Sequence, residues 1–111
     1  MCFFAFQSLP HGPGGRLLGD LMAGKINQAL ANSALYLKVF GHAVIGWRWL
    51  EQAVKAQQGL AAGNEADTAF YQGKLQAARY FLRWEVPSCH HDLNVLENRD
   101  LTCYDMQDAW F

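Results

Sequence analysis

A long pattern of apolar residues runs from about Asn27 to Gln58 without a proline, and this pattern predicts one long helix. When the segment is projected at about 100° per residue, its large apolar side chains fall on one broad face. Lys38, His42 and Arg48 lie with other polar residues on the opposite face. We therefore expect an amphipathic helix whose apolar face packs against another part of the protein. That face contains Leu35, Tyr36, Val39, Phe40, Ala43, Trp47, Leu50 and Val54.

Four further apolar residues of this segment lie outside that face, among or beside the polar positions. A helix that packs against a single neighbour needs only one apolar stripe. The additional side chains therefore predict a second contact, made with a partner surface. The candidate partner interface consists of Leu37, Val44, Ile45 and Trp49.

A second helical pattern follows a short break, where Gly59 is the expected first residue after the first helix. Asn64 is a good N-cap for the next helix, because its side chain can accept a hydrogen bond from a free backbone N–H. Aromatic and small residues then form stripes along residues 65–86. Pro87 is expected to end or kink this helix, since proline lacks the N–H that an interior helical residue donates.

Small residues occur on both predicted helices where they would allow close packing. Gly73 and Ala77 are one turn apart on the second helix, so another helix could approach them closely. We predict that they face two glycines of the first helix in an antiparallel hairpin. The candidate helix-packing residues are Gly41, Gly46, Gly73 and Ala77.

The N-terminal part of the sequence is interrupted by a cluster of two prolines and three glycines at residues 9–15. Such a cluster predicts a loop. We expect an unstructured or atypical segment over residues 1–15, followed by a helical domain over 16–111. A short helix, weakened by two glycines, is expected at Arg16–Ile26.

The C-terminal part begins with the segment "SCHHDLNVLEN", which predicts a short helix with Cys89, Leu93 and Leu96 turned inward. The sequence ends in Trp110 and Phe111, whose large apolar side chains are costly to leave in water. We therefore expect the tail to dock on the helices. The predicted fold is all-α, a helical hairpin or small up-down bundle with a docked C-terminal tail.

The composition points to a protein with a partner. The chain has 111 residues, of which 51% are hydrophobic and only 17% are charged. Soluble domains contain about 25% charged residues, so this chain is short of solvating side chains. Its net charge of −1 gives no reason to expect a nucleic-acid partner. A membrane span is not expected either, because Lys38 and Arg48 would both lie deep in hydrocarbon.

Candidate chemistry is sparse. The three cysteines, Cys2, Cys89 and Cys103, form no CxxC pair, which favours reduced thiols in a cytoplasmic protein. The run Cys89–Asp92 offers several ligand types, but adjacent helical residues point about 100° apart and cannot converge on one ion. No nucleophile-elbow or phosphate-loop motif occurs. The sequence therefore predicts no catalytic, cofactor-binding or metal site.

Two segments and the tail resemble the C-terminal domain of acyl-CoA dehydrogenases of the 3-methylmercaptopropionyl-CoA dehydrogenase type. That domain carries a "YLxLFG…GW" helix, a "FYxxKxxTARFF…LP" helix and a tail that ends in acidic and aromatic residues. The resemblance covers about residues 27–111, whereas residues 1–26 do not follow the family well. The matching positions here are Tyr36–Gly41 with Gly46 and Trp47, Phe70–Phe81 with Val86 and Pro87, and the final "MQDAWF".

The resemblance implies that the whole enzyme is an FAD-dependent flavoprotein of fatty acid metabolism that oxidises an acyl-CoA. The glutamate base and the flavin contacts of such enzymes belong to a core that precedes this domain, so no position here corresponds to them. The resemblance implies that this chain is a non-catalytic assembly module, a fragment or detached part that binds no cofactor alone. Its implied partner is a dehydrogenase core, in cis or in trans, within a cytoplasmic oligomer.

One alternative stays open at this point. The surplus apolar residues also suit an independent helical homodimer or interaction protein that has no dehydrogenase partner and binds only itself.

Overall fold

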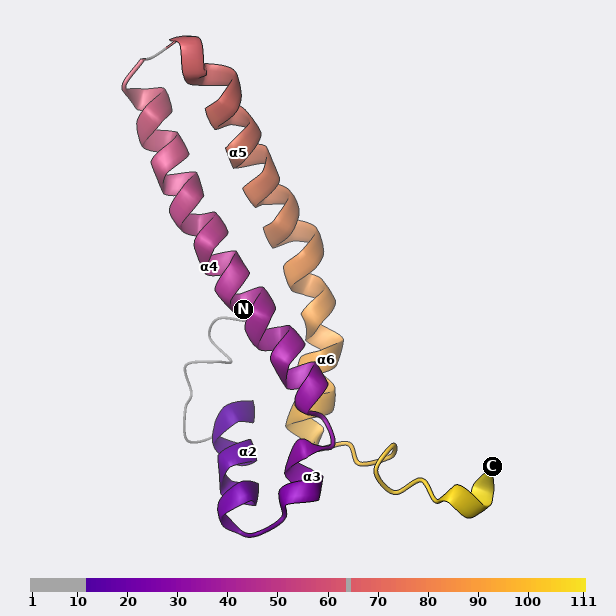
Figure 1. The fold of residues 1–111 in the computed structure, drawn as a ribbon. Helices are drawn as coiled ribbons and strands as arrows, with labels where there is room; N and C mark the ends of the chain where they lie inside the picture. The colour runs from indigo at the N-terminus through magenta and orange to yellow at the C-terminus, as the bar shows by residue number, and fades with distance from the viewer. Residues whose placement is uncertain (1–11, 64) are drawn as a thin grey trace. The chain divides into compact units, whose positions relative to one another are not determined.

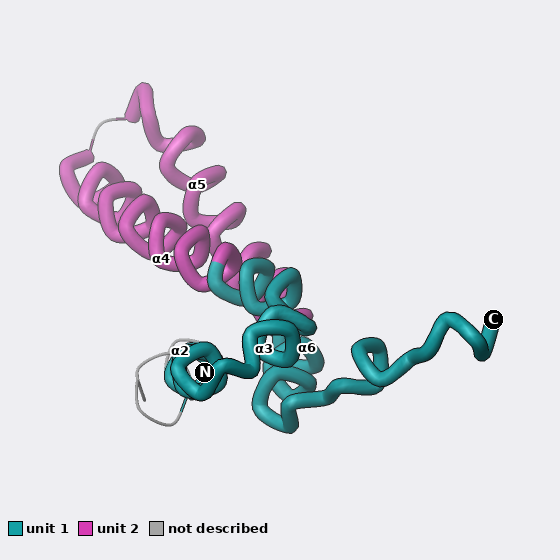
Figure 2. Tube along the Cα trace, turned by 60° about the horizontal axis from the view of Figure 1, so that its bottom comes forward, with its two compact units in different colours: residues 1–40, 89–111 teal, residues 41–88 magenta. Residues whose placement is uncertain are grey.

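A computed structural model describes residues 12–63 and 65–111 (Figure 1). Within these ranges the regular elements are all helical, which confirms the all-α class that the sequence predicts. Contacts between Cα atoms divide the chain into two compact units (Figure 2). Unit 1 comprises residues 1–40 and 89–111, and unit 2 comprises residues 41–88.

Unit 1 begins with helix α2 (Pro13–Met22), which starts three residues before the predicted position. Pro13 suits this start because its fixed φ fits the first helical turn, where its missing N–H is not needed. The predicted helix Arg16–Ile26 is wrong at its end. Gly24 adopts a positive φ of 76°, which ends the helix and begins a turn.

Helix α3 (Ile26–Leu30) and helix α4 (Ser33–Ala61) replace the single long helix predicted from Asn27. The break between them lies at Asn32. The side-chain amide of Asn32 donates a hydrogen bond of 2.6 Å to the carbonyl oxygen of Asp100. Asparagine side chains often bind backbone groups and so compete with the helical pattern, a competition that periodicity alone does not show.

Two contacts connect α2 with the end of helix α6 (Val86–Asn98) inside unit 1. The Arg16 guanidinium donates a hydrogen bond of 2.6 Å to the carbonyl oxygen of Glu97. The Arg99 guanidinium lies 3.3 Å from Asp20. Arg99 itself has a positive φ of 52° and ends α6, as the backbone N–H of Asp100 reaches the carbonyl of Val95.

Unit 2 is an antiparallel hairpin, as the sequence predicts. The C-terminal part of α4 runs beside helix α5 (Thr68–Tyr80), and the 3₁₀ turn η1 (Glu65–Asp67) precedes α5 (Figure 1). The predicted helix end at Gly59 is wrong, because Gly59 lies inside α4. Gly63 takes the left-handed conformation instead, with a φ of 74°. The N-cap prediction for Asn64 lies outside the described residues.

Pro87 does not end the helical run. Helix α5 is followed by the π-helical turn η2 (Phe81–Glu85) and then directly by α6, in whose first turn Pro87 lies. A proline cannot donate a hydrogen bond to the preceding turn and its ring crowds the carbonyl there, so a wider turn relieves the conflict. Downstream, Cys89 and Leu93 are buried as predicted, and Leu96 is half-buried.

The C-terminal tail differs from the prediction. Trp110 is 63% exposed and Phe111 is 94% exposed, so neither docks on the described part of the chain. The start of the tail is attached by Asn32, whose side-chain amide donates its hydrogen bond to the carbonyl oxygen of Asp100. The free-energy cost of exposing two aromatic side chains predicts that some surface covers them. It does not specify which surface, so it could not predict whether the tail docks on its own helices.

Candidate functional site

The hairpin of unit 2 is held together by small side chains. Gly46 and Ala56 of α4 are buried, and between them Trp49 and Ala53 are half-buried. This spacing of three and four residues is the spacing of antiparallel helices that pack closely. Ala78 is buried on the opposite helix. The face of α4 toward α5 therefore consists mainly of small residues.

The four predicted helix-packing positions have different surroundings. Gly46 lies against η2 and the first residue of α6, because a Cβ at this position would be 3.6 Å from the Phe81 ring and 3.9 Å from Val86. A Cβ at Gly41 or Gly73 would meet nothing within 4 Å among the described residues, so close packing does not occur there. Ala77 is half-buried.

A close approach that sequence reasoning missed lies at Gly59. A Cβ at this residue would overlap the ring of Tyr71. The sequence pattern predicts a helix end at Gly59, whereas the structure places it inside α4, where it leaves room for an aromatic ring of the facing helix. Its pairing with Tyr71 could not be read from either segment alone, because it depends on the register of the hairpin.

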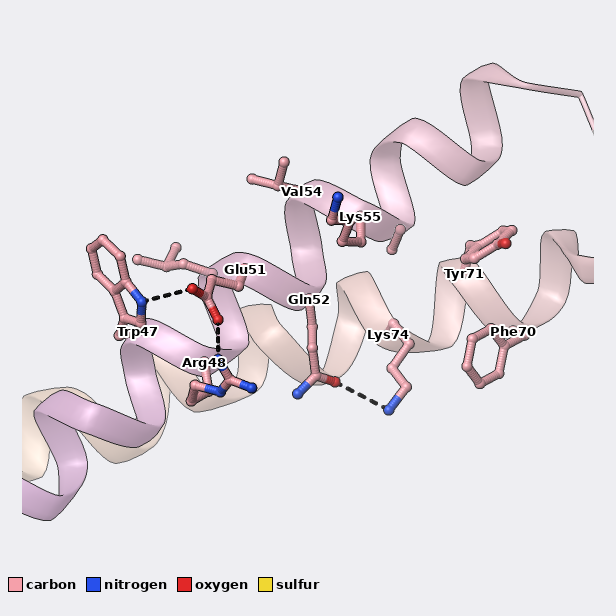
Figure 3. A pocket seen from close by; sticks show the side chains of 11 residues that line it. Trp47, Arg48, Glu51, Gln52, Val54, Lys55, Phe70, Tyr71 and Lys74 are labelled. Carbon is pink, nitrogen blue, oxygen red and sulfur yellow. Dashed lines mark hydrogen bonds and ion pairs between the residues drawn. The ribbon is translucent and has the colours of Figure 1, made fainter.

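Three large apolar residues of α4 lie elsewhere, on an exposed face. We call Trp47, Leu50 and Val54 the outer stripe, and these side chains are 43% to 56% exposed. Figure 3 shows Trp47 and Val54 pointing away from α5. The inward packing expected for them is wrong, because periodicity locates a stripe but not the neighbour it meets. The smaller face packs inside the hairpin and the larger one remains uncovered.

The predicted partner-interface residues are mostly exposed. Leu37 in unit 1, and Val44 and Ile45 in unit 2, each leave a large part of their side chain uncovered. Trp49 differs, since it is half-buried and the Lys74 ammonium lies 5.7 Å from the centre of its ring. The role of these residues in binding a partner stays a prediction.

Polar side chains surround the outer stripe. The Trp47 indole donates a hydrogen bond of 2.9 Å to Glu51 Oε1, and the Arg48 guanidinium lies 2.5 Å from Glu51 Oε2 (Figure 3). On the facing helix, the Lys74 ammonium donates a hydrogen bond of 3.2 Å to Gln52. These residues and the stripe line an open hollow of about 730 Å³. The hollow is an apolar surface with charged edges.

Unit 1 contains one nearly buried charge. The Asp92 side chain is only 9% exposed, and its Oδ2 lies 2.7 Å from the Lys38 ammonium. Among the described residues this oxygen has no further hydrogen-bond partner. The hydrogen bond and the negative charge of Asp92 raise the pKa of Lys38 above its usual value. Sequence reasoning did not predict this pair, because the two residues are far apart in the chain.

Two further properties concern the described residues as a set. No three histidine, cysteine or acidic side chains come together there in a way that could hold a metal ion. No helix in the described ranges is both long enough and apolar enough to cross a bilayer. Of the two cysteines in the described ranges, Cys89 is buried and Cys103 is exposed.

Comparison with known proteins identifies the family of this all-helical chain. Residues 14–107 match the family model described as acetyl-CoA dehydrogenase C-terminal like. The chain belongs to this family. The resemblance to acyl-CoA dehydrogenase C-terminal domains is thus confirmed at the level of the family. Because the family match begins at residue 14, residues 14–26 belong to it as well, contrary to expectation.

A curated relative of this C-terminal-like domain is the broad-specificity linear acyl-CoA dehydrogenase FadE5 of Mycobacterium tuberculosis (strain ATCC 25618 / H37Rv). The two are 29% identical over 106 residues, which cover 90% of this chain. The chain spans only 17% of the length of that relative. No solved structure matches the chain.

Proposed function

We propose that this chain is a non-catalytic helical assembly module of an FAD-dependent acyl-CoA dehydrogenase. The observation that carries the proposal is the uncovered apolar surface of a family member that spans 17% of its relative. Monomeric proteins rarely leave large contiguous apolar patches in water, and such patches commonly mark interaction sites. The module therefore binds the dehydrogenase core, in cis or in trans.

In this proposal the chemistry belongs to the core. The core would hold the FAD and the acyl-CoA, and the flavin would supply the oxidising chemistry when bound there. The module contributes by holding the core in its assembled form. We place the assembled enzyme in the cytoplasm, because the three cysteines of the sequence form no CxxC pair and no spacing typical of a disulfide framework.

Two classes of acyl-CoA are candidate substrates of the core. The relative acts, by its name, on linear acyl-CoA with broad specificity, whereas the sequence motifs resemble the 3-methylmercaptopropionyl-CoA type. We favour a linear acyl-CoA, because the comparison extends over 90% of the chain and the motifs cover two helices and the tail. Assays of the core with both thioesters distinguish the two.

The contact with the core is assigned to Val44 and Ile45, which are exposed and lie in unit 2. The test mixes the chain with a purified dehydrogenase core that lacks this domain and follows co-elution and flavin-linked acyl-CoA oxidation. We expect the chain to co-elute with the core and to raise its activity or its stability. The double variant Val44→Glu, Ile45→Glu should lose both effects.

The matched control is Trp84→Ser, which removes a side chain that is 72% exposed on another helix. This control should bind the core like the unchanged chain. If the unchanged chain neither co-elutes with the core nor affects it, the assembly role is wrong.

A further inference from the structure

The C-terminal segment of the chain, residues 102–111, is apolar and acidic at once. Its apolar side chains, Trp110 and Phe111 above all, are exposed. Asp105 and Asp108 carry negative charge, and the segment contains no lysine or arginine. A 3₁₀ turn, η3 (Asp108–Trp110), gives its end a defined local conformation. The segment thus has the properties of a short peptide that binds an apolar surface with a basic edge.

The outer stripe is such a surface. Its three members, Trp47, Leu50 and Val54, lie within about 60° of one another around α4, at about 100° per residue. Arg48 and Lys55 line the same hollow as the stripe, on its polar side next to Glu51.

The charge at the edge of the stripe is net positive. Glu51 is already engaged by the Trp47 indole and the Arg48 guanidinium. Lys55 has no ion-pair partner among the described residues. Its ammonium is therefore available to a negatively charged partner at the edge of an apolar surface.

We propose that the outer stripe binds the 102–111 segment of a second copy of this chain. The aromatic side chains of the segment cover Trp47, Leu50 and Val54, and its aspartates lie near the basic edge. Opposite charges at an interface favour the correct partner, whereas like charges disfavour the wrong one. Two stripes facing each other are the less favourable pairing, because Arg48 and Lys55 would then meet basic residues.

A second copy is a suitable source of the segment, because two copies can cover each other's stripes. Each copy has one uncovered stripe and one uncovered segment. When two copies exchange segments, both stripes are covered and the assembly closes as a twofold dimer. The proposal uses other residues of α4 than Val44 and Ile45 and concerns the chain alone, so it does not depend on binding to a dehydrogenase core.

The first test measures self-association of the full chain by sedimentation or light scattering. The double variant Trp110→Ser, Phe111→Ser should raise the dimer dissociation constant at least about 100-fold, the change expected when two hot-spot aromatics are lost. Trp84→Ser is the matched control and should leave the constant unchanged. A chain that stays monomeric throughout, or a double variant that dimerises normally, overturns the proposal.

The second test separates binding between copies from binding within one copy. A chain with a defective stripe, Val54→Glu, is mixed with the Trp110→Ser, Phe111→Ser chain. Exchange between copies predicts mixed dimers, because one intact stripe and one intact segment remain, and neither variant alone should dimerise. Absence of mixed dimers alongside dimers of the unchanged chain overturns the proposal.

The third test addresses the charges and avoids large changes in the stripe. Lys55→Glu should weaken the dimer, and combining it with Asp108→Lys should restore much of the loss. Far-ultraviolet circular dichroism checks that each variant keeps its helical content. If Lys55→Glu folds normally and dimerises as tightly as the unchanged chain, the proposed basic edge is not used.

Discussion

At the scale of single residues, the chain relies on a few specific contacts. Asp92 is nearly buried and Lys38 is its charge partner, at 2.7 Å. Removing one member of such a pair leaves the other charge without compensation. Gly59 has a comparable role in packing, because the Tyr71 ring occupies the space where a side chain would be. Both residues therefore act through one neighbour each, in unit 1 and in unit 2 respectively.

The Lys38–Asp92 pair should make stability depend on alkaline pH. The pKa of Lys38 is raised in the folded chain, first by the hydrogen bond to Asp92 and then by its charge. The stabilisation is fully present below the pKa of an unfolded lysine, 10.5, and is lost as pH rises through the raised pKa of the folded chain. Urea unfolding of the unchanged chain should show this loss, and Lys38→Met should not show it. Identical pH profiles for the two chains would contradict the assignment.

A second prediction concerns the close contact at Gly59. Replacing an interior helical glycine with alanine normally stabilises a helix by about 1 kcal/mol. Gly59→Ala should instead destabilise the chain, because overpacking costs about 1–3 kcal/mol and the Tyr71 ring must move. Gly73→Ala, where nothing lies within 4 Å, is the matched control and should stabilise. The urea midpoint of each variant, compared with that of the unchanged chain, gives the direction of its stability change. An equal rise of the midpoint in both variants would rule out the contact between Gly59 and Tyr71.

At the scale of elements, α4 carries two faces that differ in size and in use. The small face, with Gly46 and Ala56, is buried in the hairpin. The large face, the outer stripe, is exposed. Between α5 and α6, the π turn η2 makes room for Pro87. The helical run therefore continues into α6, although a proline would disrupt a regular α-helix at this position. Each of these elements departs from a simple amphipathic pattern for a local steric reason.

The need for small side chains on the buried face of α4 can be tested by enlarging one of them. Ala56→Leu adds volume where the helix meets its neighbour and should destabilise the chain by about 1–3 kcal/mol. Gln57→Leu, on the next residue and exposed, should change stability by less than about 0.5 kcal/mol. Thermal unfolding at low protein concentration is the measurement. A stabilising effect of Ala56→Leu would show that the helices are not closely packed there.

At the scale of the whole molecule, the described chain buries little of its large apolar surface. Its buried apolar residues are mostly small, whereas many large ones are exposed on both units. A short chain of this kind has difficulty in covering its apolar surface alone. The chain belongs to a dehydrogenase C-terminal family and spans 17% of the length of its relative. Both findings agree with the proposal that association with a partner stabilises the chain.

Association with the core should therefore appear as added stability. A partner that binds only the folded chain stabilises it by about 2.7 kcal/mol when its free concentration is 100 times the dissociation constant. Adding the dehydrogenase core should raise the melting temperature of the chain, monitored through a label on the chain. The Val44→Glu, Ile45→Glu variant should gain nothing from the core. An unchanged melting temperature at saturating core would argue against the proposed module.

The sequence by itself determined the helical class, the antiparallel hairpin and the family. These follow from local signals: apolar periodicity of about 3.6 residues, glycine and proline breaks, and motifs on two helices. It also indicated a surplus of apolar side chains, since that is a property of composition.

Only the tertiary structure decided which face of α4 is buried, where helices approach closely and which charges pair. Trp47 and Val54 have the pattern of core residues, yet they are exposed because smaller residues allow the closer contact with α5. Gly59 with Tyr71 and Lys38 with Asp92 meet only once the helices have a defined register. Such pairings depend on three-dimensional distances between residues far apart in the chain, and a pattern of neighbours along one helix does not contain them.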